Sequence, residues 1–215
     1  MTNSNSKKRS VLGIIAIILC FVMLLGATWA WFTDIVTNSG NKIESGGLKV
    51  DLELYDATAG TWASVANSAD PIFTLTNWQP TDSVVQVLRV TNEDTADLQW
   101  YATIQEQNDT KGLSDVIDVY VMALTDPADT TGLIADANKV GTLTECITGN
   151  FDDVLRGTLG GGSENNVNNS YTFGVALVMQ STAENEYELA EAKFDITVHA
   201  TQAEDVDFLP ASGTP

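Results

Sequence analysis

The sequence predicts an all-β protein, an antiparallel jelly-roll β-sandwich with one or two short helices in connecting loops, preceded by an N-terminal signal helix. Three observations predict this fold. From residue 46 onward, apolar residues recur with a period of two, and turn-forming residues interrupt the chain at short intervals. Ahead of that region, a basic start is followed by a long apolar run.

The alternation is strictest in residues 48–54, where leucine and valine alternate with lysine, aspartate and glutamate. This pattern is typical of a strand with one buried face. In the same way, apolar residues share one face in residues 171–179 and again in residues 194–200. The candidate strands are residues 48–54, 72–76, 84–91, 99–105, 116–124, 171–180 and 193–201.

One segment, residues 143–159, departs from the period of two. Its apolar residues Ile147, Phe151, Val154 and Leu155 recur at roughly helical spacing. This spacing predicts a short helix or two between the strands.

The first 30 residues have the three-part layout of a secretory signal peptide. Residues 7–9 are basic, and residues 11–27 form an almost uninterrupted apolar run. Thr28 and Ala30 are small residues at the minus-three and minus-one positions of a cleavage site, so Trp31 is expected to begin the mature chain. The alternative is a retained membrane anchor, because an apolar run of about 20 residues can span a bilayer as a helix.

Cleavage would leave a chain of roughly 185 residues, enough for one domain with a single core. Cys20 lies in the leader, so Cys146 is the one mature thiol and is expected to act as a small buried hydrophobe. We expect four parts: a signal peptide (1–30), an extended N-terminal segment (31–45), a β-sandwich domain (46–203) and a C-terminal tail (204–215).

The chain is strongly acidic, with 10 Lys and Arg against 29 Asp and Glu and a formal net charge of -19. Nucleic acids and anionic lipid surfaces require basic patches, so neither is an expected partner. Contact with a membrane is expected only through the uncleaved leader. The charge suits a soluble, self-repelling protein outside the cell.

Few residues offer catalytic or metal chemistry. His199 is the only histidine, which excludes a zinc site with two histidines, and its place in a predicted strand favours an outward-facing, solvated side chain. The run 160–162 lacks the lysine of a phosphate-binding loop and is interpreted as part of a flexible linker. Three acidic pairs could in principle bind calcium: Asp152 with Asp153, Asp126 with Asp129, and Asp205 with Asp207. None has the glycine-centred loop of a calcium site, so we expect these carboxylates to form a solvated negative surface. We therefore expect no enzyme activity and no cofactor.

Two patterns in the first half of the chain carry a resemblance. Residues 26–34 (GATWAWFTD) are followed by Asn-Lys-Ile at 41–43 and by Gly-Gly-Leu-Lys-Val-Asp-Leu at 46–52. Residues 78–82 (WQPTD) then lead into a strand that ends in asparagine. Together they resemble the TasA/camelysin family of secreted proteins of Gram-positive bacteria, although Thr81 stands where that family usually has glycine.

The resemblance implies that the chain is a subunit of biofilm-matrix or cell-surface fibres whose leader is removed by the signal peptidase SipW. It also implies that the mature N-terminal segment of one copy adds as a donor strand to the sheet of the next, which gives a head-to-tail homopolymer. The expected anchors are Trp31, Phe32, Ile35 and Val36, and their burial would contribute roughly 6 to 12 kcal/mol per joint before ordering costs. Accessory matrix proteins are further partners that the resemblance suggests.

Two other functions stay open. A monomeric surface adhesin or accessory matrix protein would fold the same N-terminal segment back into its own sheet. Camelysin has been described as a protease, which raises an enzyme alternative, but one histidine without a zinc motif does not support it.

Overall fold

The computed structural model describes residues 33–37, 42–43, 48–66, 68, 70–161, 168–183, 187 and 189–202. The chain divides into two units, Met1–Trp31 and Phe32–Pro215, and every described residue belongs to the second. The expected signal helix, its cleavage site and the C-terminal tail from residue 204 therefore lie outside the described residues.

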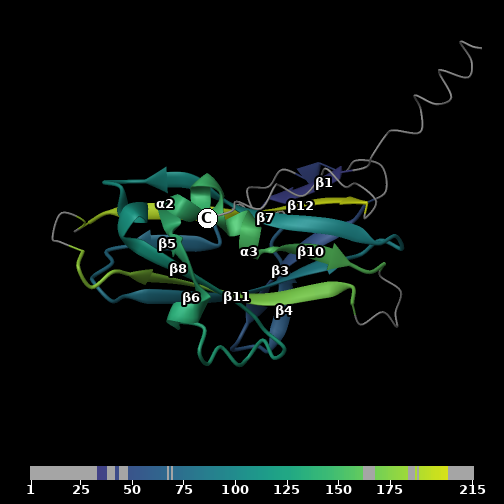
Figure 1. The fold of residues 1–215 in the computed structure, drawn as a ribbon, viewed down its shortest axis with the longest axis horizontal. Coiled ribbons are helices and arrows are strands. Elements are labelled where there is room, and N and C mark those ends of the chain that lie inside the picture. Colours follow the sequence, from purple (N-terminus) through teal and green to yellow (C-terminus); the bar gives the residue numbers. More distant parts are fainter. Residues whose placement is uncertain are drawn as a thin grey trace, which may run out of the picture. The chain divides into compact units, whose positions relative to one another are not determined.

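The described residues form an all-β fold of antiparallel strands in two six-stranded sheets (Figure 1). Sheet A has the order β10-β7-β12-β1-β2, with β5 also paired to β12, and sheet B has the order β4-β3-β6-β11-β8-β9. The strands of sheet A are β1 (Thr33–Thr37), β2 (Lys42–Ile43), β5 (Phe73–Thr76), β7 (Leu98–Asp109), β10 (Arg156–Leu159) and β12 (Glu191–Gln202). Those of sheet B are β3 (Val50–Asp56), β4 (Thr61–Ser64), β6 (Ser83–Asn92), β8 (Ile117–Ala123), β9 (Lys139–Thr142) and β11 (Ser170–Met179).

One hydrophobic core joins the two sheets, an arrangement compatible with a β-sandwich. Leu52 and Phe173 of sheet B and Trp100 and Phe194 of sheet A belong to this core and are almost fully buried. The Trp100 ring lies 6.4 Å from the Phe173 ring and 5.4 Å from the Tyr171 ring, centroid to centroid. Aromatic side chains bury large areas, so these cross-sheet contacts contribute strongly to stability.

Each of the seven predicted strands coincides with an observed one, within one or two residues at most ends. The predicted shared faces are also confirmed, because the alternating apolar residues of β11 and β12 lie in the common core. Sequence alternation did not reveal β4, β9 and β10. Each of these has only four residues.

The prediction of a short helix or two within residues 143–159 is confirmed, and the helices occupy the first part of that segment. The segment contains α2 (Leu143–Glu145), the π-helical turn η3 (Cys146–Asn150) and α3 (Phe151–Val154). Thr142 and Glu145 begin α2 with a capping box, and Gly149, with φ of 141°, interrupts the helical backbone. The last residues of the segment, Arg156–Leu159, form the strand β10, which pairs with the edge of β7.

Two short 3-10 helices complete the described elements, η1 (Leu113–Val116) and η2 (Asp136–Asn138). Among the residues that the structure describes, no helix has the length and apolar character needed to cross a membrane.

Candidate assembly site

Strand β12 is the place where three segments distant in the sequence meet. One edge of β12 pairs with β7 along residues 192–202. The other edge is divided between two strands: residues 191–194 pair with β5, and residues 197–201 pair with β1. Figure 1 shows β1 beside β12. β1 therefore covers the part of this edge that β5 leaves open.

All five residues of β1 stand opposite residues of β12. The pairs are Thr33 with Thr201, Asp34 with Ala200, Ile35 with His199, Val36 with Val198, and Thr37 with Thr197. On the β12 side, Val198 and Ala200 are fully buried in the core. The second edge of β1 pairs with β2, so β1 lies within the sheet and β2 lies beyond it.

The structure places two of the four expected anchoring residues, Ile35 and Val36, in this joint between β1 and β12. The other anchors and the cleavage residues lie outside the described residues: Trp31, Phe32, Thr28 and Ala30. β1 pairs with β12 of its own chain. This is the arrangement expected if the N-terminal segment folds back into its own sheet.

His199 occupies the middle of the β12 residues that β1 covers. Its ring stacks on Tyr101 of β7, with centroids 4.6 Å apart and planes inclined by 10°. Its Nε2 lies 3.2 Å from the hydroxyl oxygen of Thr103. Burial lowers the pKa of His199, and the Asp152 carboxylate opposes that shift. His199 alternates with the core residues Val198 and Ala200, as the predicted outward-facing position requires, but the predicted solvation is wrong, because the ring is half-buried against Tyr101.

Thr81, which stands where the TasA/camelysin motif has glycine, lies in the turn before β6. The Asp82 N–H donates to the Gln79 carbonyl, and the Asp82 carboxylate accepts from the Gln79 N–H. Thr81 has φ of 77°, a left-handed conformation that glycine adopts without a Cβ penalty. A turn with proline followed by a positive φ is where glycine is ordinarily required. Thr81 therefore stands, with strain, at a position suited to glycine.

No family model, curated protein or solved structure matches this chain. The resemblance to the TasA/camelysin family therefore rests on the motifs in residues 26–52 and 78–82 alone. The role of the β1–β12 joint follows from its strand pairing.

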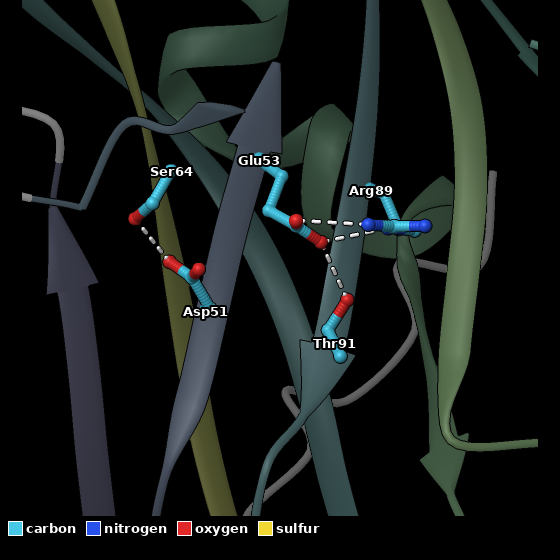
Figure 2. Close-up of polar contacts among 5 residues, drawn as sticks. All are labelled: Asp51, Glu53, Ser64, Arg89 and Thr91. Atoms are coloured by element: carbon cyan, nitrogen blue, oxygen red, sulfur yellow. Dashed lines mark hydrogen bonds and ion pairs between the residues drawn. The ribbon is translucent and has the colours of Figure 1, made fainter. Parts of the chain in front are cut away.

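A second group of polar side chains lies on β3, β4 and β6 (Figure 2). Glu53 accepts hydrogen bonds from Arg89 Nε at 2.7 Å, from Arg89 Nη2 at 2.8 Å and from the Thr91 hydroxyl at 2.9 Å. The Ser64 hydroxyl donates to Asp51 Oδ1 at 2.6 Å. These bonds join β3 to both of its neighbours, so the cluster helps to hold the three strands in register.

The pKa values of the two carboxylates in this cluster are shifted in opposite directions. Burial would raise the pKa of Glu53, but the hydrogen bonds from Arg89 and Thr91 hold it below its ordinary value. Burial raises the pKa of Asp51, and the Ser64 hydroxyl only partly offsets this. The Arg89 guanidinium also lies 4.3 Å from the centroid of the Trp62 ring.

The remaining candidate residues have structural roles in the described part of the chain. Cys146 is a free thiol that is buried in the core, as expected, and its burial, together with Glu145, raises its pKa to about 12. The thiolate is the reactive form, so this thiol is protected from ordinary chemistry at neutral pH.

The acidic pairs take part in turns and in an ion pair. Asp126 Oδ1 accepts from the Ala128 N–H, and Asp129 Oδ1 accepts from the Thr131 N–H. Asp153 lies 3.6 Å from Arg156. Within the described ranges no three side chains of the metal-ligating types lie together, and the pair at 205 and 207 falls outside those ranges.

The interpretation of residues 160–162 as a flexible linker is wrong for the first two residues. Asn92 Nδ2 donates to the Gly160 carbonyl at 2.9 Å, and the Gly161 N–H donates to Asp97 Oδ1 at 2.8 Å. A Cβ added at Gly161 would overlap the Thr95 carbonyl. The two glycines therefore permit a close approach of backbones, while residues 162–167 lie outside the described part.

Proposed function

We propose that this protein is a secreted structural subunit of extracellular biofilm-matrix or cell-surface fibres, with the jelly-roll form of the β-sandwich. The observation that carries the proposal is the divided edge of β12, where β5 pairs with residues 191–194 and the five-residue β1 pairs with residues 197–201. A short strand near the expected mature N-terminus is a segment that can be exchanged between copies.

The physical basis is the backbone of β12. When β1 is withdrawn, residues 197–201 lose their pairing partner on one edge, and their N–H and C=O groups become an open template. The same five residues from another copy restore identical contacts, as in domain swapping. Because each copy donates at one place and accepts at another, the contact is head-to-tail, and wherever successive exchanges do not close on themselves the assembly propagates into a filament.

Closed monomers compete with filaments. The short connection to β3 keeps β1 near its own β12 at an effective concentration of about millimolar, so exchange between copies is favoured only at high local concentration or during export. The uncleaved leader would delay exchange until a SipW-type peptidase cuts after Ala30. N-terminal sequencing of the exported protein tests this step: a chain beginning at Trp31 supports it, and one beginning at Met1 or Thr2 contradicts it.

Electron microscopy of the mature protein tests the fibre function. The matched pair is the mature chain and a variant in which residues 31–37 are replaced by a glycine-serine segment of equal length. We expect filaments from the first and none from the second. Equal filament yield from both would contradict donor-strand exchange.

The alternative of a monomeric surface adhesin or accessory matrix protein is favoured by one observation, the pairing of β1 with β12 of its own chain. This alternative predicts a mature protein that stays monomeric over a wide concentration range. Light scattering from micromolar to millimolar protein separates the two functions, because only the fibre subunit shows a steep rise in mass.

A further inference from the structure

A pocket opens at the end of the two sheets where β10 finishes and β11 starts, and we call it the end pocket. Thr158 and Leu159 of β10 line it from sheet A, and Ser170 and Tyr171 of β11 line it from sheet B. Three loop residues complete the described lining: Asp97, Gly160 and Asn168. The volume of the pocket is about 640 Å³. Small-molecule sites range over roughly 300–1,000 Å³, so the end pocket can hold an organic ligand.

Buried hydrogen bonds fix the walls of the end pocket. The fully buried Asn92 donates from Nδ2 to the Gly160 carbonyl at 2.9 Å and to the Ala96 carbonyl at 2.8 Å. Its N–H donates to the Asn169 carbonyl at 2.7 Å, and the Gly160 N–H donates to the Asn168 carbonyl at 3.0 Å. These bonds join the end of β10 to the start of β11. The pocket is therefore formed in advance, and a ligand does not have to order its walls.

Several polar groups of the end pocket have hydrogen-bonding capacity that the described residues leave unused. Asp97 Oδ1 accepts from the Gly161 N–H at 2.8 Å, and no described residue donates to Oδ2. The hydroxyls of Thr158, Ser170 and Tyr171 make no hydrogen bond to any described residue. One carboxylate oxygen and three hydroxyls are thus available to a ligand that both donates and accepts hydrogen bonds.

Tyr171 combines a fixed ring with an available hydroxyl. Its ring lies 5.4 Å from the Trp100 ring and 6.1 Å from the Phe173 ring, centroid to centroid. Burial raises the pKa of Tyr171 above its ordinary value, so the hydroxyl stays protonated at neutral pH. The hydroxyl of a buried tyrosine usually has a hydrogen-bond partner. In the end pocket a bound ligand can supply that partner without moving the ring.

A second pocket, of about 280 Å³ between β8, β9 and α3, provides a comparison. Its polar side chains are already engaged. Lys139 forms an ion pair with Asp118 at 2.7 Å, and Asp153 lies 3.6 Å from Arg156. Asn138 Nδ2 donates to a backbone carbonyl at 2.9 Å. This pocket therefore presents few unused polar groups to a ligand, in contrast to the end pocket.

The charges around the end pocket decide which class of ligand it suits. Asp97 is the one charged residue of the described lining, and Glu93 and Asp94 lie in the same turn between β6 and β7. In a chain with a net charge of -19, anionic ligands are repelled from such a place. A cation would leave the donor capacity of the three hydroxyls unused. A neutral ligand with many hydroxyl groups satisfies both the carboxylate and the hydroxyls.

We infer that the end pocket binds a neutral saccharide, either a free sugar or a unit of a polysaccharide chain. Asp97 Oδ2 accepts a hydrogen bond from a sugar hydroxyl, and the hydroxyls of Ser170 and Tyr171 exchange hydrogen bonds with others. Leu159 and the Tyr171 ring supply an apolar wall for the C–H groups of the sugar.

The end pocket does not depend on exchange of β1. Its described lining includes no residue of β1 or β12, and β7 and β12 separate β10 from β1 in sheet A. The same pocket is therefore present in a monomer and in a fibre. A fibre repeats the pocket many times, and multivalency raises avidity for a long polysaccharide by about 10²–10⁴.

Ligand-observed NMR with the exported protein tests the inference, because this method detects weak binding. The neutral probes are glucose, galactose, mannose and N-acetylglucosamine, each as the monosaccharide and as a linear trisaccharide. Trigalacturonate is the anionic probe, and spermidine is the cationic one. We expect a neutral probe to bind with a dissociation constant of about 1 mM, the strength that a few hydrogen bonds in water provide.

The result with each class of probe has a defined meaning. Tighter binding of a trisaccharide than of its monosaccharide identifies a polysaccharide chain as the ligand, and equal binding identifies a free sugar. Binding of none of the neutral probes, or of spermidine or trigalacturonate alone, overturns the inference.

Two substitutions locate the binding in the end pocket. Tyr171→Phe removes the hydroxyl and keeps the ring against Trp100, so we expect affinity to fall about threefold to tenfold. The matched control is Tyr55→Phe on β3, which makes the same change outside the pocket. Asp97→Asn keeps an acceptor for the Gly161 N–H and removes the charge, so we expect affinity to fall about tenfold.

Asp94→Asn is the control for Asp97→Asn, since it changes the same turn outside the described lining. Both controls should bind like the unchanged protein. Unchanged affinity in both pocket variants, or an equal loss in the controls, overturns the inference. If the exported protein forms no filaments, the proposed fibre function fails, and these affinities still decide whether the end pocket binds sugar.

Discussion

Thr197 lies on β12 at the end of the β1 joint and carries a buried hydroxyl. Its side chain is 1% exposed, and its Oγ1 has no hydrogen-bond partner among the described residues. We expect Thr197→Val to raise the free energy of unfolding, because valine keeps the shape and removes the hydroxyl. An unpaired buried polar group costs about 1–3 kcal/mol, so a gain of about 1–2 kcal/mol is expected.

Urea denaturation of the wild type and the variant measures this gain. Thr91→Val is the matched control, since the Thr91 hydroxyl donates to Glu53 at 2.9 Å and its loss should cost about 1 kcal/mol. The two substitutions are chemically identical and should shift the midpoint in opposite directions. A lower midpoint for Thr197→Val would show that the hydroxyl has a partner and would refute the described packing of β12.

Three further predictions concern other positions. Thr81→Gly should raise the free energy of unfolding by about 1 kcal/mol in the same urea assay, because it relieves left-handed strain at φ of 77°. Gly161→Ala should lower it by about 1–3 kcal/mol through overlap with the Thr95 carbonyl, whereas Gly157→Ala, whose Cβ meets its nearest atom at 3.7 Å, should be milder. Burial lowers the pKa of His199 in the folded state, so the unfolded chain binds more protons, and stability should fall as pH decreases below 6.5 towards the folded pKa. His199→Gln should flatten thermal stability across that window, and an unchanged pH profile would contradict the buried histidine.

The long strands could be predicted from the sequence because one of their faces is buried. In β3 and β12 the alternation of apolar and polar residues follows directly from the common core. The shorter strands carry too few residues for a period to emerge. β10 also follows a segment with helical spacing, and its pairing with β7 overrides that local preference.

Of the two strands that form the candidate site, the sequence indicated the N-terminal one but did not indicate that it pairs with β12. The apolar segment after Ala30 indicated a strand, but its partner lies 160 or more positions away in the sequence, and nothing local encodes the register of Thr33 with Thr201. The stacking of His199 on Tyr101 and the ion pair of Glu53 with Arg89 are likewise cross-strand contacts. They become predictable only after the strand order is known.

A disulfide trap tests most directly whether β1 is exchanged between copies. Thr37 and Thr197 stand opposite each other in the β1–β12 register, at a spacing that a disulfide can bridge. The variant carries Thr37→Cys and Thr197→Cys in a Cys20→Ser background and is oxidised after filament assembly. Head-to-tail exchange predicts a ladder of covalent oligomers on a non-reducing gel. Monomers with an internal disulfide as the sole product from assembled filaments would contradict it.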